Sequence, residues 1–132
     1  MNSTRKVRVL IAKPGLDGHD VGAKIVVRAL MEAGFDVVYT GLKRSPYEIL
    51  SIAKEKGVNV IGLSILSGSH LPICETLAKL RKQHGLEDLL WIVGGNIPNA
   101  DHEKLKALGV DAVFAVGSPP KSIVDFIREK TS

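Results

Sequence analysis

Five short apolar runs alternate with helix-like segments along this chain of 132 residues. The runs are rich in Val, Ile and Leu and cover residues 7–12, 35–39, 58–63, 89–93 and 111–115. Continuous apolar runs of this length are typical of strands buried on both faces, and their alternation with helices is typical of a parallel sheet. The pattern predicts a flavodoxin-like (Rossmann-like) α/β sandwich of three layers, with a five-stranded parallel sheet of order 2-1-3-4-5 and helices on both faces.

The segments between the runs carry signals for helix starts and stops. Residues 45–48, Ser-Pro-Tyr-Glu, form a capping box with proline at the first helical position, and Gly57 ends that helix. Ser118 before two prolines is expected to be the N-cap of the last helix. The periodicity predicts the other helices at about residues 23–33, 71–84 and 100–108.

Length, charge and cysteine content bound the class of protein. A chain of 132 residues is expected to form one domain, residues 1–132, with residues 1–4 as a disordered tail. The net charge of +4 is spread over the helices and aromatic residues are few, so nucleic acid is not an expected partner. A single cysteine, Cys74, fits a reducing compartment. The sequence shows neither a signal peptide nor a membrane-length apolar run, which predicts a cytoplasmic protein without membrane contact.

The loop after the first apolar run, residues 13–22, reads Lys-Pro-Gly-Leu-Asp-Gly-His-Asp-Val-Gly. In an open parallel sheet this loop lies at the carboxyl edge, where ligands bind. Asp17 stands two residues before His19 and four after Lys13. A carboxylate beside an imidazole takes the ring N–H and leaves the other nitrogen to face a metal ion. The loop therefore indicates a metal ligand, although a solvated turn would use the same Asp and Gly residues.

Three further loops at the same predicted edge are rich in glycine and serine: residues 64–69, 94–96 and 117–118. Ordinary turns with N-caps would explain each of them. Two consecutive glycines at a strand end, however, leave a slot without side chains over which a flat or long group can pass. Since the loops after the first and third strands border the ligand crevice of this fold, we expect a glycine-lined groove there with His19 at its mouth.

Two other kinds of site fit this chain less well. The glycines at 15, 18 and 22 have the wrong spacing for a phosphate-binding loop. A receiver domain of the response-regulator type would need an acidic cluster at the end of the first strand, which here reads Ala12-Lys13.

The remaining candidates have plainer explanations. A zinc site is conceivable but lacks the short ligand pairs of structural zinc sites; its ligands would be His19, His70, Cys74 and His102. His70, His84 and His102 are otherwise expected to be exposed or at helix ends, with His70 close enough to the groove to approach a ligand. Cys74, Trp91 and Phe35 are expected in the core.

Three motifs in this order resemble those of cobalamin-binding domains. Residues 17–22, Asp-Gly-His-Asp-Val-Gly, match D-x-H-x-x-G; Ser64-Ile65-Leu66 matches S-x-L; and Gly94-Gly95 matches the G-G pair. The longer stretches 12–19 and 62–68 resemble the B12-binding part of methylmalonyl-CoA mutase and related acyl-CoA mutases, which is a C-terminal domain or a small subunit. The resemblance runs from about residue 5 to the end of the chain.

The resemblance implies that the cofactor is adenosylcobalamin, bound with its own base displaced. His19 would be the lower axial ligand of cobalt, with Asp17 and then Lys13 behind it, and Ser64 would hydrogen-bond the benzimidazole in the groove. Many relatives read F-G-P-G-T where this chain reads Phe-Ala-Val-Gly-Ser at 114–118, so Ala115 and Val116 depart from the pattern. The residues assigned to the cofactor are Lys13, Asp17, Gly18, His19, Asp20, Gly22, Ser64, Leu66, Ser67, Gly94, Gly95, Phe114, Gly117 and Ser118.

The resemblance implies no catalytic residue in this chain alone. In the family the acyl-CoA substrate binds a separate TIM barrel, where homolysis of the cobalt–carbon bond starts a radical rearrangement. The chain would therefore be the non-autonomous B12-binding subunit of an isomerase of the methylmalonyl-CoA mutase type, docking onto a large barrel subunit. The alternative is a corrinoid carrier or a cobalamin-responsive module. It ranks second because carriers have a helical cap domain where this chain has only residues 1–4 before the first strand.

Overall fold

The computed structural model describes residues 7–14, 21–41 and 44–131. Its sheet is entirely parallel, with the strand order β2-β1-β3-β4-β5. This order confirms the prediction from the alternating apolar runs. The strands are β1 (Arg8–Ala12), β2 (Asp36–Tyr39), β3 (Val60–Ile65), β4 (Leu90–Gly95) and β5 (Ala112–Ala115).

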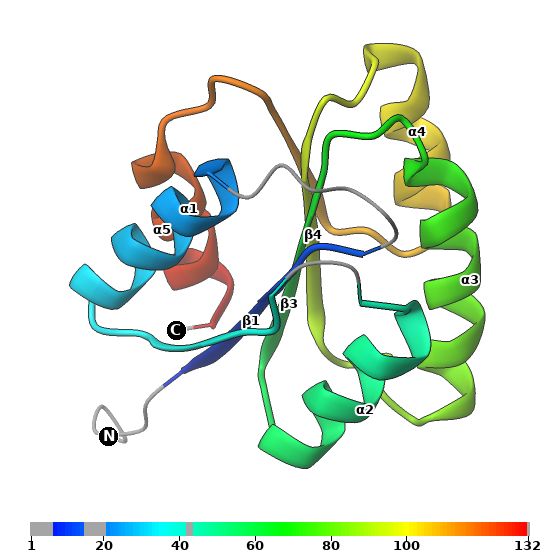
Figure 1. The fold of residues 1–132 in the computed structure, drawn as a ribbon, viewed down its shortest axis with the longest axis horizontal. Helices are drawn as coiled ribbons and strands as arrows, with labels where there is room; N and C mark the ends of the chain where they lie inside the picture. The colour runs from blue at the N-terminus through cyan, green and yellow to red at the C-terminus, as the bar shows by residue number, and fades with distance from the viewer. Residues whose placement is uncertain (1–6, 15–20, 42–43, 132) are drawn as a thin grey trace.

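Helices cover both faces of the sheet and make three layers (Figure 1). Two helices, α1 (Val21–Glu32) and α5 (Pro120–Thr131), lie side by side on one face. The other face carries α2 (Pro46–Lys56), α3 (His70–Gln83) and α4 (Asn99–Ala107). Among the described helices, none is both long and apolar enough to cross a membrane.

Each face of the sheet has its own apolar core, because successive side chains of a strand point to opposite faces. Leu10, Ile61 and Val93 belong to the core under α2, α3 and α4, whereas alternate residues such as Val9 and Val60 belong to the core under α1 and α5. The predicted core positions are confirmed: Trp91 and Cys74 are fully buried and Phe35 is nearly so.

The start and end signals of α2 work as the sequence predicts. The Ser45 side chain accepts a hydrogen bond from the Glu48 N–H at 3.1 Å, and the Glu48 carboxylate accepts one from the Ser45 N–H at 2.9 Å. The backbone hydrogen bond to Ser45 lowers the pKa of Glu48. Gly57 ends the helix in the left-handed region, with φ 62°.

The structure corrects the carboxyl ends of two strands, which were predicted to stop at residues 63 and 93. Ser64 and Ile65 still belong to β3, and Gly94 and Gly95 still belong to β4. The two pairs lie in register, Ser64 with Gly94 and Ile65 with Gly95. Strand pairing with a parallel neighbour here overrides the low strand preference of glycine and serine.

The predicted N-cap of the last helix is also wrong. The Ser118 hydroxyl donates to the carbonyl of Ala115 at 2.7 Å, and α5 begins only at Pro120. The hydroxyl is therefore used to close the turn after β5 and not to cap the helix.

Gly95 is required by the backbone. Its φ is 131°, and a Cβ placed there would overlap the carbonyl oxygen of Ile65. A Cβ at its neighbour Gly94 would make only an ordinary contact, 3.5 Å from the carbonyl oxygen of Phe114. The backbone therefore requires glycine at residue 95, whereas at residue 94 it would tolerate a Cβ.

We predict that Gly95→Ala lowers the free energy of unfolding by about 3 kcal/mol or more, because it adds both a strained φ and a backbone clash. The matched variant Gly94→Ala is expected to change it by less than about 1 kcal/mol. Urea unfolding of both variants measures the difference. Equal losses in the two would contradict the distinction.

Candidate functional site

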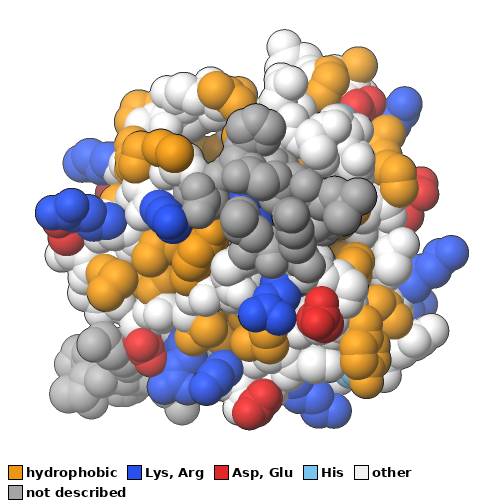
Figure 2. Space-filling model, in the orientation of Figure 1, with side chains coloured by type: hydrophobic (Ala, Val, Ile, Leu, Met, Phe, Trp, Pro, Cys, Tyr) orange, Lys and Arg blue, Asp and Glu red, His pale blue; other side chains and the backbone are white. Residues whose placement is uncertain are grey.

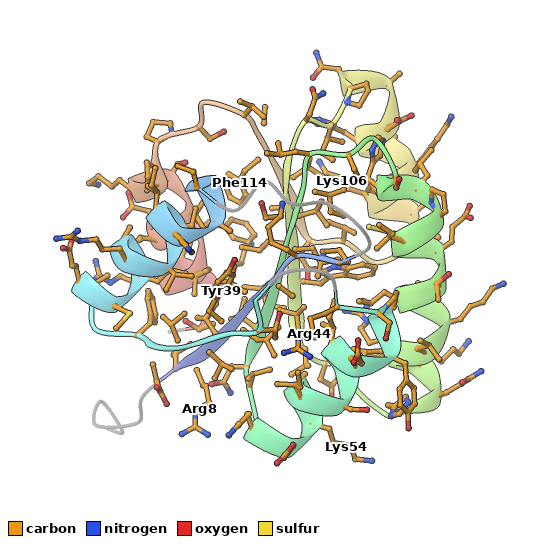
Figure 3. All side chains as sticks on the ribbon, in the orientation of Figure 1. Arg8, Tyr39, Arg44, Lys54, Lys106 and Phe114 are labelled. Carbon is orange, nitrogen blue, oxygen red and sulfur yellow. The ribbon has the colours of Figure 1, made fainter. Side chains whose placement is uncertain are left out.

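A cavity of about 200 Å³ opens between the carboxyl edge of the sheet and the first turns of α1 and α5. It lies on the α1 and α5 face of the sheet, where Phe114 and Tyr39 also pack (Figure 3). The residues that line it are Ile11, Gly22, Ala23, Val26, Gly62, Leu63, Ser64, Leu66, Ile92, Gly94, Gly95, Phe114, Ala115, Val116, Gly117, Ser118 and Ile123.

Two glycines lie on the floor of the cavity, but only one of them leaves space there. The floor consists of two rows of register partners: Ile11, Gly62 and Ile92, and then Ser64, Gly94 and Phe114. A Cβ at Gly62 would lie 2.8 Å from Cδ1 of Ile11 and 3.3 Å from Cγ1 of Ile92, so these side chains already use the space. Gly94 has no neighbour so close, and it lines the cavity.

The lining is mainly apolar. Among the described residues of the lining only Ser64 and Ser118 have polar side chains, and the Ser118 hydroxyl is already used in its bond to Ala115. Apolar cavities with a few placed polar groups suit flat, largely apolar ligands that make one or two directed hydrogen bonds. Ser64 is the side chain placed to make such a bond from the floor.

Lys13 connects the ends of β1 and β3. Its side chain is fully buried, and its ammonium donates to the Ser64 carbonyl at 2.8 Å and lies 3.4 Å from the Ser64 hydroxyl. A charged hydrogen bond of this kind fixes Ser64 more firmly than a neutral one would. The lysine therefore braces the residue that presents a hydroxyl to the cavity.

The structure brings most of the predicted cofactor-binding residues to this one cavity. Lys13 does not line the cavity but binds the lining residue Ser64. Ser67 is exposed in the loop after β3 and is not part of the lining. The residues at the cavity are Gly22, Ser64, Leu66, Gly94, Gly95, Phe114, Gly117 and Ser118. Asp17, Gly18, His19 and Asp20 lie outside the described residues.

Sequence reasoning missed the inner part of the floor. Ile11, Gly62 and Ile92 lie inside apolar runs, where nothing but a glycine among β-branched residues distinguishes them. That glycine was a usable signal, because glycine inside a strand often marks a place of close approach.

His70 is at a helix end, as expected, but it is buried, with only 5% of the residue exposed. Its Nε2 lies 2.7 Å from Oδ2 of Asp101, and this bond lowers the pKa of Asp101. The structure does not support the alternative zinc site at His19, His70, Cys74 and His102. Within the described ranges, no group of three His, Cys, Asp or Glu side chains could hold a metal ion. One of its four proposed ligands, His19, lies outside those ranges.

Exposed apolar side chains stand beside the cavity. Val21 precedes the lining residue Gly22 on α1 and is 71% exposed, and Val116 of the lining itself is 66% exposed. Figure 2 shows apolar side chains gathered on the side of the molecule where α1 lies. The surface around the opening can therefore contact an apolar group as well as solvent.

A family model described as the B12 binding domain matches residues 7–124. A 2-hydroxyisobutanoyl-CoA mutase small subunit from Aquincola tertiaricarbonis is 46% identical over 122 residues, which are 92% of this chain and 90% of that subunit. An ethylmalonyl-CoA mutase from Methylorubrum extorquens is 48% identical over 108 residues, which are 81% of this chain but only 16% of the enzyme. The chain thus spans nearly all of one relative and about a sixth of the other.

Among solved structures, a cobalamin-binding protein from Desulfitobacterium hafniense superposes with a TM-score of 0.84 at 23% identity. The match covers 97% of this chain and 60% of that one. At this identity the likeness shows the fold alone.

Cys74, one of the four ligands of the conceivable zinc site, can be tested directly. Burial raises the pKa of its thiol to about 12, so the reactive thiolate is nearly absent at neutral pH. We predict that iodoacetamide at pH 8 leaves the folded protein unmodified and labels it fully in urea. Intact mass reads the result directly, because the chain has one cysteine. Rapid labelling of the folded protein would show that Cys74 is an accessible thiol and would reopen its role as a ligand.

Proposed function

The chain belongs to the B12-binding domain family, and on this premise we propose that it is the cobalamin-binding subunit of an adenosylcobalamin-dependent acyl-CoA mutase. The observation that carries the proposal is the cavity above Gly94, an apolar, glycine-floored space with one directed hydroxyl at the carboxyl edge of the sheet. The proposal treats this chain as the non-autonomous part of an isomerase, without a catalytic residue of its own.

The cavity fits the nucleotide end of cobalamin. Dimethylbenzimidazole is flat and mostly apolar, with a nitrogen that accepts one hydrogen bond when it is not bound to cobalt. The floor at Gly94 leaves room for a flat ring, and the Ser64 hydroxyl is available as the donor. Leu66, Phe114 and Gly117 would enclose the ring and the chain that leads to it.

We propose that His19 would ligate the cobalt of the cofactor, on the strength of the D-x-H-x-x-G motif at residues 17–22. Asp17 would take the other ring N–H, which fixes the tautomer and makes the free nitrogen a better donor. The buried ammonium of Lys13 stands where this loop leaves β1. Once bound, adenosylcobalamin supplies a cobalt–carbon bond whose homolysis begins the radical rearrangement of the acyl group.

The proposal requires a second, larger subunit. A relative named as a small subunit aligns over 90% of its length, whereas in the ethylmalonyl-CoA mutase the matching part is a minor share of a much longer chain. We propose that a TIM-barrel subunit binds the acyl-CoA and closes over the cofactor from the side away from this chain. We also propose that the complex is cytoplasmic. We propose the reaction only at the level of acyl-CoA mutases, because the relatives are named for different acyl groups.

In free adenosylcobalamin the cofactor's own base binds cobalt, and in the proposed complex a histidine replaces that base. We predict that the purified protein shifts the absorption spectrum of adenosylcobalamin from the first form to the second, and that His19→Ala abolishes the shift. Mutase activity is expected only after a barrel subunit is added, and His19→Ala should reduce it to background. The control variant is His84→Ala, since His84 caps the far end of α3 and should change neither measurement.

An unchanged spectrum with wild-type protein would overturn the proposal. A shifted spectrum without activity on any acyl-CoA mutase barrel would favour the corrinoid carrier or cobalamin-responsive module instead.

A second prediction concerns the floor. Gly94→Val should weaken adenosylcobalamin binding by about tenfold or more, because the new side chain occupies the ring's space and overpacking of that kind costs about 1–3 kcal/mol. The control is Ala112→Val, which also ends in a valine side chain but stands on the neighbouring strand outside the lining. Equal affinity for both variants, measured by spectroscopic titration, would place the tail elsewhere.

A further inference from the structure

A buried polar pair joins two helices at the same edge of the sheet as the cavity. His70 is the first residue of α3 and Asp101 lies in the first turn of α4, with Nε2 and Oδ2 2.7 Å apart. The His70 side chain is 6% exposed and that of Asp101 is 17% exposed. Lys104 adds a weaker contact to the other carboxylate oxygen at 3.7 Å. The pair is thus shielded and directional, unlike the exposed ion pairs of the surface.

Neither helix has a capping side chain to fix its start. Ser69 and Pro98 stand at the N-cap positions of α3 and α4, and neither makes a side-chain capping bond. By contrast, α2 begins with a complete capping box. Because an uncapped first turn frays easily, the bond between His70 and Asp101 is the directional contact that holds these two turns together.

The same pair joins the helix ends of two loops that border the cavity. Residues 66–69 connect β3 to α3, and residues 96–98 connect β4 to α4. At their strand ends the loops are joined by the bond from the Asn96 N–H to the Ile65 carbonyl, at 3.2 Å. At their helix ends they are joined by His70 and Asp101. Leu66 and Gly95, at the bases of these loops, line the cavity.

A contribution to stability does not by itself explain why a histidine is buried at position 70. Its Nδ1 is enclosed and has no hydrogen-bond partner among the described residues, which costs about 1–3 kcal/mol. Replacing such a pair with apolar side chains is often neutral for stability, so a buried pair of this kind is better evidence for fixed geometry than for strength.

We propose that His70 and Asp101 are positioning residues for cofactor binding: their bond sets the two loops at the spacing that the nucleotide tail of cobalamin requires. This inference rests on the proposed function. It assigns the pair no contact with the reacting atoms, and its effect is expected on the tail and not on the corrin ring.

The test compares two probes, adenosylcobalamin and cobinamide, which lacks the nucleotide tail. His70→Leu and Asp101→Ala should weaken adenosylcobalamin binding by about tenfold or more, since small displacements in a binding site are costly, and leave cobinamide binding within about twofold. Asp101→Asn keeps an oxygen that accepts from the ring N–H, so its affinity for adenosylcobalamin should stay within about threefold of wild type.

The matched control is Arg81→Met, at the other end of the same helix, where the guanidinium donates to the Leu89 carbonyl at 3.2 Å and covers Trp91. It should lower stability without changing the ratio of the two affinities. A loss that is equal for both probes, or no loss in His70→Leu and Asp101→Ala, would overturn the positioning role. If His70→Leu fails to fold, the comparison of Asp101→Ala with Asp101→Asn decides alone. Wild-type protein that binds neither probe would instead refute the proposed function.

Discussion

The close approach of β3 and β4 at their carboxyl ends is the constraint on which the site depends. Gly95 can pass the Ile65 carbonyl only because it has no side chain, and this passage carries the strand pairing two residues beyond the apolar runs. The extended pairing places Ser64 and Gly94 side by side inside the sheet. A rigid strand end, and not a loop, therefore presents both the hydroxyl and the open floor.

The two faces of the sheet are used for different purposes. The face under α2, α3 and α4 is filled by large side chains, with Trp91, Ile61 and Leu77 fully buried. The face under α1 and α5 has a smaller core that gives way to the cavity near the carboxyl edge. Packing on the first face supplies stability, so the second face can leave space for a ligand without loss of the fold.

Two buried polar contacts at this edge each join neighbouring elements. Lys13 binds the Ser64 carbonyl across from β1 to β3, and His70 binds Asp101 across from α3 to α4. Both bonds join segments that are distant in sequence and adjacent in space. Two buried, directional contacts thus stand beside the cavity, which suits the proposed role of holding a large cofactor in one orientation.

The sequence alone determined the layer architecture, because apolar periodicity and capping signals such as those of Ser45 and Gly57 are local properties. The strand order could be predicted only because five alternating strand and helix units usually adopt this arrangement. The motif residues that gather at the cavity, such as Ser64 and Gly94, could likewise be predicted from the sequence. Only the tertiary structure decided that these residues lie within strands, that Gly62 and Ile92 complete the floor, that Ser118 closes a turn and that His70 is buried against Asp101. Each of these depends on a partner far along the chain, and local sequence preferences carry no information about which neighbour the fold supplies.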